Sequence, residues 1–164
     1  MIAVGAGALM YYLQVYAFYD EVSSDVANVQ MTSVVSGEAE PVLFENYKGI
    51  DSDSSPLRYR ACYDMPLSLA LLTETYVIQD AAEPRVAPAW FDCLDAAQIG
   101  ADLEAGIAIP FMGQENVQYG IDRIVAVYPD GRAFAWHQIN DCGEVVFDGN
   151  PTPDHCPTPP EGLN

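Results

Sequence analysis

The chain opens with an apolar segment that runs to the first charged side chain, Asp20. As a helix, residues 1–19 would be about 28 Å long at about 1.5 Å per residue, close to the thickness of a bilayer core. Tyrosines surround this helix and leave no polar face, and tyrosine is common where a helix leaves a bilayer. The pattern therefore predicts a transmembrane anchor over residues 1–19. A buried core helix and a cleaved signal peptide are the alternatives, although no Lys or Arg precedes the run as in a signal peptide.

Small residues near the start of this segment would let a second helix approach closely. Ala3 and Gly7 form a small-xxx-small pair, and Gly5 lies between them. We expect these three residues to pack against helices of an integral membrane complex, although such residues are also simply common in membrane helices. Tyr11 lies near the middle of a span that starts at Met1, so the pattern predicts either further residues before Met1 or a short, tilted span.

Short runs of alternating apolar and polar residues follow a polar connector at residues 20–28, and they predict β-strands. Strands are expected over residues 29–35, 41–47, 57–63, 75–78, 107–112 and 145–147. Residues 67–72 fit either a helical turn or a strand. Most of the chain is therefore expected to form sheet.

One helix is expected over residues 93–105, because apolar residues recur on one face and Asp92 or Asp95 can cap its start. Gly106 is well placed to end it. Further along, residues 119–128 and 133–139 flank a Pro-Asp-Gly-Arg turn and predict a β-hairpin.

The predicted fold class is α+β. An N-terminal transmembrane helix precedes a small, mostly antiparallel β domain with one main helix, over residues 29–149. The tail at residues 150–164 contains five prolines and cannot enter a ladder.

Cysteine and charge both point to an exported domain. The four cysteines are Cys62, Cys93, Cys142 and Cys156, and an even number suggests two disulfides among three possible pairings. Cys142–Cys156 is favoured because it closes a short Gly/Pro-rich loop, which leaves Cys62–Cys93. The absence of Lys and Arg from residues 1–47 favours a position outside the cytoplasm for the C-terminal domain.

The formal net charge is −18, from 24 acidic and 6 basic residues. Such a surface repels phosphate backbones, so we expect no nucleic-acid partner. It would attract a basic periplasmic protein, although solubility alone also explains an acidic surface.

Few residues suggest specific chemistry. Arg58 and Arg60 alternate on one face of an expected strand, where they would meet Asp or Glu partners or, alternatively, bind a carboxylate ligand. His137 is expected in the core or on a sheet face, and a thiolate–imidazole pair with Cys93 is the alternative. Asp51-x-Asp53-x-Ser55 has the opening spacing of a calcium loop but lacks its later glycine and glutamate, so it indicates a solvated turn. We predict no catalytic residue, cofactor or metal.

Several stretches keep a fixed order around the four cysteines. They are MYYLQVYAFY, SSPLRYRACY, WFDCLDA and GQENVQYGIDRIVAVYPDGRAFAWHQINDCGEVVFDG. In these stretches the chain resembles a group of uncharacterised alphaproteobacterial proteins with one membrane span and a small exported domain. The resemblance covers most of the chain and implies an anchor and a periplasmic domain. It implies no activity, so no catalytic residue is carried over.

These features together predict a non-enzymatic accessory subunit, anchored once in the bacterial inner membrane with its acidic domain in the periplasm. The expected setting is an electron-transfer complex, respiratory or photosynthetic. The alternatives are a small periplasmic enzyme or ligand-binding domain with a pocket near Arg58, Arg60 and His137, and a transient assembly factor.

Overall fold

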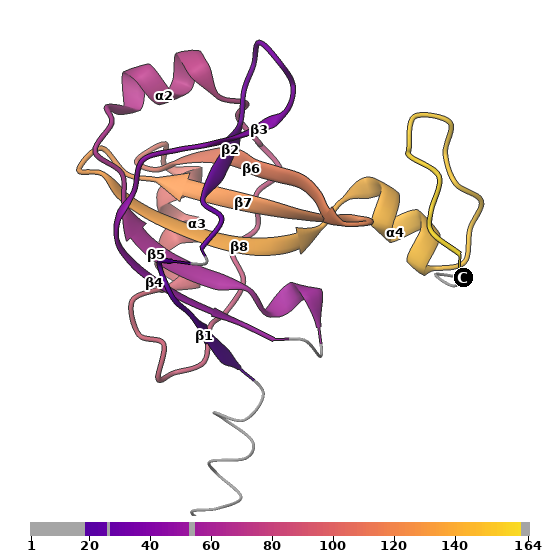
Figure 1. The fold of residues 1–164 in the computed structure, drawn as a ribbon, viewed down its shortest axis with the longest axis horizontal. Helices are drawn as coiled ribbons and strands as arrows, with labels where there is room; N and C mark the ends of the chain where they lie inside the picture. The colour runs from indigo at the N-terminus through magenta and orange to yellow at the C-terminus, as the bar shows by residue number, and fades with distance from the viewer. Residues whose placement is uncertain (1–18, 26, 53–54, 162–164) are drawn as a thin grey trace, which may run out of the picture.

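The computed structural model describes residues 19–25, 27–52 and 55–161. Within these ranges the chain forms eight strands, three α-helices and one 3-10 turn (Figure 1). The strands are β1 (Asp20–Val22), β2 (Gln30–Thr32), β3 (Ala39–Pro41), β4 (Glu45–Asp51), β5 (Arg60–Asp64), β6 (Ile109–Gln118), β7 (Ile121–Val127) and β8 (Arg132–Ile139). The helices are η1 (Pro56–Arg58), α2 (Leu69–Thr75), α3 (Ala96–Glu104) and α4 (Asp141–Phe147).

Six strands form one antiparallel sheet in the order β1-β4-β5-β8-β7-β6, and β2 pairs with β3 in a separate two-stranded sheet. The predicted hairpin is present as β7 and β8, in register from Ile121↔Ile139 to Val127↔Ala133. Gly131 sits in the turn with φ +94°, a conformation that favours glycine. Asp20–Val22, expected in the connector, instead form an edge strand against β4.

Both faces of the large sheet are covered. On one face Val125 and Val127 pack with Met31, Leu72 and Phe111, beneath the β2–β3 hairpin and α2. On the other face the alternate residues of β7 pack against Trp136 and the segment that leads into α3. Because successive side chains of a strand point to opposite faces, a continuous apolar run such as Ile124–Val127 is explained by burial on both sides.

The best-predicted helix is α3. Asp95 caps it, with its side chain accepting a hydrogen bond from the Gln98 amide at 3.1 Å, and Gly106 follows it with φ +74°. Buried Asp102 on α3 accepts a hydrogen bond from the hydroxyl of Tyr128, which lies just beyond β7. This bond fixes the helix to the sheet.

The predicted fold class is wrong in its transmembrane part. No helix in the described ranges is long and apolar enough to cross a membrane. Residues 1–18, which include Ala3, Gly5 and Gly7, lie outside the described residues. Tyr19, the last residue of the predicted anchor, packs edge-on against Trp90 of the domain, with 5.8 Å between ring centroids.

The prediction of one main helix is also wrong, because α2 and α4 accompany α3. Residues 145–147 were expected as a strand but lie in α4. The reason is local: the Asn140 side chain accepts a hydrogen bond from the Gly143 amide at 2.9 Å and starts a helix there. Residues 75–78 were also expected as a strand, but Thr75 ends α2, and Tyr76 and Ile78 form only isolated bridges, Ser33↔Tyr76 and Ile78↔Phe111.

The structure contains both favoured disulfides, Cys62–Cys93 and Cys142–Cys156. The first joins a central strand to the segment before α3. The second joins α4 to the proline-rich tail, which forms no strand over its described part and projects with α4 from one end of the sheet (Figure 1). The Tyr119 hydroxyl also donates a hydrogen bond to the Pro157 carbonyl at 2.7 Å.

Candidate functional site

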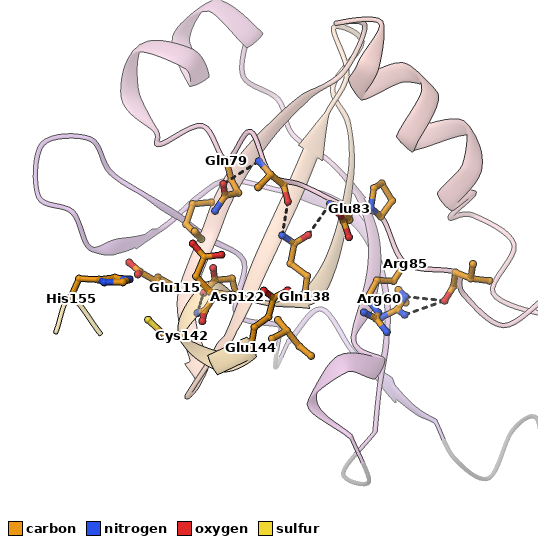
Figure 2. Close-up of a pocket in the computed structure, with 17 residues that line it drawn as sticks. Arg60, Gln79, Glu83, Arg85, Glu115, Asp122, Gln138, Cys142, Glu144 and His155 are labelled. Atoms are coloured by element: carbon orange, nitrogen blue, oxygen red, sulfur yellow. Dashed lines mark hydrogen bonds between the residues drawn. The ribbon is translucent and has the colours of Figure 1, made fainter. Parts of the chain in front are cut away.

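An open groove of about 880 Å³ lies between α4, the ends of β6–β8 and the segment at residues 79–86 (Figure 2). Its lining is mostly polar. The ionisable residues that line it are Glu83, Glu115, Asp122, Asp141 and Glu144, with Arg60, Arg85 and His155. Acidic groups therefore outnumber the arginines five to two.

The floor of the groove is held by a network around Asp122, which is 3% exposed. One carboxylate oxygen of Asp122 accepts hydrogen bonds from the Asn116 amide at 3.0 Å and the Asn140 side chain at 2.9 Å. Asn140 also donates to the side chain of Asn116 at 2.9 Å. Since Asn140 caps α4, the network fixes this helix to the β6–β7 hairpin.

Close packing of two glycines brings α4 onto the hairpin. A Cβ atom on Gly143 would overlap the carbonyl oxygen of Gly120, and a Cβ on Gly120 would overlap the backbone of Gly143. Gly120 also has φ +79°. Glycine at both positions is therefore needed for α4 to pack this closely on the hairpin, and α4 forms one wall of the groove.

Gln138 ties the opposite wall to the sheet. Its side-chain oxygen accepts hydrogen bonds from the Glu83 amide at 2.9 Å and the Trp136 indole at 3.0 Å. Its amide group donates to the Ala81 carbonyl at 3.0 Å. The segment that carries Glu83 and Arg85 is thereby held beside β8.

Arg60 is 5% exposed and hydrogen-bonds only to backbone carbonyls among the described residues. Its Nη1 donates to the Leu57 and Tyr59 carbonyls, each at 2.6 Å. Its Nε and Nη2 donate to the Val86 carbonyl at 3.3 and 3.1 Å. Burial, with a smaller contribution from the positive charge of Arg85, lowers the pKa of Arg60 to about 10.

None of the five groove carboxylates forms an ion pair with a described residue. Arg132 and Asp130 do form an ion pair at 2.8 Å, but it lies on the exposed β7–β8 turn, outside the groove. The negative charge of the groove is therefore not neutralised by the described part of the chain.

His137 does not line the groove. Its Nε2 accepts a hydrogen bond from Arg123 Nε at 3.0 Å, so its proton lies on Nδ1, which donates to the Pro56 carbonyl at 2.6 Å. The ring stacks on Tyr59, with 4.7 Å between centroids. Burial, and then the positive charge of Arg123, lower the pKa of His137 to about 4.

The remaining predicted site residues are dispersed. The Arg58 guanidinium lies over the ring of Tyr19, 5.7 Å from its centroid. Cys93 is joined to Cys62, so it offers no thiolate to His137. The considered calcium spacing includes Asp53, which lies outside the described residues.

Cys142, Cys156 and His155 have ligand atoms within 4.8 Å of one another. The two sulfurs are bonded to each other in the disulfide, so the cluster offers no thiolate in this state.

The sequence does not single out the groove, because its carboxylates come from three separate segments in a chain with 24 acids. One signal was available: Asp122 and Arg123 are charged residues in the otherwise apolar strand β7, where a charge needs a structural or functional reason. The sequence around Arg85 has no comparable feature that would have marked it as a groove residue.

No curated protein and no solved structure matches the chain. One family model does match, over residues 29–157, which takes in all the described strands except β1. The chain belongs to this family, a family of unknown function (DUF6446).

Proposed function

We propose that this protein is a non-enzymatic accessory domain, acting outside the cytoplasm, that binds a basic protein partner through its acidic groove. One observation carries the proposal: five carboxylates line an open groove and none is paired with a described cation. Like charges gathered in one groove attract a partner of opposite charge, which steers association and favours the correct partner.

Two further observations support the proposal. Both disulfides suit an oxidising compartment, where such bonds persist. The small-enzyme alternative has less support, because His137 is held between Arg123 and a backbone carbonyl and Cys93 is oxidised. Association with an electron-transfer complex stays a prediction.

The test measures binding of a fluorescent ten-residue peptide rich in lysine. The groove variant carries Glu115→Gln and Glu144→Gln, and the matched control carries Glu45→Gln and Glu74→Gln, which removes the same charge from exposed positions outside the groove. We expect the groove variant to bind about fivefold more weakly than the control, since an exposed ion pair contributes up to about 1 kcal/mol.

Binding should also weaken as NaCl rises from 50 to 300 mM, because salt screens exposed charges. Equal losses in the two double variants would show attraction to the whole surface instead of the groove, and would contradict the proposal.

A further inference from the structure

The groove is not uniformly acidic, because two guanidinium groups lie at one end of it. Figure 2 shows Arg60 and Arg85 together at this end, and Glu115, Asp122 and Glu144 toward the other. Neither arginine forms an ion pair with any residue that the structure describes. In a chain with four acids for each basic residue, an arginine pair with no acidic partner is unusual.

The hydrogen bonds of Arg60 do not neutralise it. Carbonyl groups accept its protons but carry no net charge, and a buried charge is costly unless an opposite charge accompanies it. Arg60 uses both N–H groups of Nη1, the Nε–H and one N–H of Nη2. A guanidinium has five N–H donors, so one on Nη2 remains for a ligand beside the exposed side chain of Arg85.

Strand register fixes how far this positive end lies from the negative one. Arg60 pairs with Trp136, and Asp122 pairs with Gln138, two residues farther along β8. Because β5 and β7 flank β8 and alternate residues share a face, Arg60 and Asp122 lie on the same face of the sheet. Strand spacings of about 4.8 Å and a rise of about 3.3 Å per residue place their Cα atoms about 12 Å apart.

This separation matches a short piece of extended chain. At about 3.4 Å per residue, a span of about 12 Å corresponds to three or four residues. A ligand that suits both ends thus carries one anionic group and, three or four residues away, basic groups.

We propose that the groove binds the C-terminal segment of a basic partner chain, with the terminal carboxylate on Arg60 and Arg85. Lysine or arginine side chains upstream of it then face Glu115, Asp122 and Glu144. The proposal rests on the proposed function and adds the part of the partner that is bound and its direction. A planar carboxylate matches the fork of guanidinium donors, which gives the contact its specificity.

A chain end suits this position better than an internal acidic residue. The arginines lie at one end of the groove, so a terminal carboxylate reaches them with no further residues to accommodate. An internal aspartate or glutamate would require the chain to continue past Arg60, which already bonds to the Val86 carbonyl.

The test compares one lysine-rich ten-residue peptide as a free acid and as a C-terminal amide. We expect the free acid to bind the native protein about tenfold more tightly, the ratio that corresponds to about 1.4 kcal/mol for a charge-assisted contact. Arg85→Gln should abolish this ratio and Arg85→Lys should keep part of it. Arg132→Gln, which removes an equal charge from an exposed position outside the groove, should leave it unchanged.

The outcomes separate the two proposals. If acid and amide bind the native protein equally, capture of a chain end is wrong while the acidic groove remains supported. If neither peptide binds, the proposed function itself is wrong. A third peptide, an amide whose last residue is glutamate, should bind like the simple amide. If it binds as tightly as the free acid, any carboxylate suffices and a chain end is not what the arginines recognise.

Discussion

At the scale of single residues, the structure is held by polar side chains that are partly or fully buried with unusual partners. Arg123 lies over the ring of Tyr59, 4.1 Å from its centroid, and donates to the Asn28 carbonyl at 3.0 Å as well as to His137. Carboxylate partners were expected for Arg58 and Arg60. Arg123 instead meets an aromatic ring, an imidazole and a carbonyl, and these groups satisfy its donors without a carboxylate.

His137 makes stability depend on pH. Its pKa is near 6.5 in an unfolded chain and about 4 in the fold, so between these values the unfolded chain binds a proton that the native state does not. The free energy of unfolding therefore keeps its full value above about pH 6.5 and falls as the pH is lowered toward 4. Between pH 7 and 5, where most carboxylates stay ionised, the loss from His137 should be about 2 kcal/mol.

Urea unfolding at several pH values measures this loss. His137→Gln should be less stable at neutral pH but should lose less stability between pH 7 and 5. His155→Gln, at an exposed position, is the matched control and should keep the native slope. A native-like slope in His137→Gln would show that another group is responsible.

At the scale of elements, local sequence signals predicted some segments and failed for others. The β7–β8 hairpin and α3 carry their own turn glycine, cap and apolar face, and both are present. Residues 145–147 resemble a strand, yet the cap at Asn140 and the approach of Gly120 make them helical. The groove could not be predicted, because only the packing of α4 on the hairpin brings Glu144 near Glu115.

Two glycine-to-alanine substitutions, one in α4 and one in α3, should change stability in opposite directions. Gly143→Ala should destabilise the protein by about 1–3 kcal/mol, because its Cβ would overlap the Gly120 backbone and displace α4. Gly100→Ala, inside α3 with nothing near the added Cβ, should stabilise by about 0.5–1 kcal/mol.

Thermal or urea unfolding measures both changes, and the lysine-rich peptide reports on the groove. Gly143→Ala should also weaken peptide binding, whereas Gly100→Ala should not. Equal stability of the two variants would show that the contact between Gly143 and Gly120 is not close in solution.

At the scale of the whole molecule, the charge of −18 acts in opposite directions on folding and on binding. With 24 acidic residues against 6 basic ones, repulsion between like charges outweighs attraction within the fold, so self-repulsion opposes the compact state. Added salt screens this repulsion and should raise the free energy of unfolding. Across the proposed interface the charges are opposite, so the same salt should weaken association with a basic partner.

The two effects can be measured on one sample series. Between 20 and 300 mM NaCl we expect the midpoint of thermal unfolding to rise while the affinity for the lysine-rich peptide falls. A chain stabilised mainly by ion pairs would show a falling midpoint, and a groove that bound mainly through apolar contact would keep its affinity. A midpoint that rises with salt and an affinity that falls with salt are therefore expected together only if the acidic groups are unpaired in the free protein and become paired in the complex.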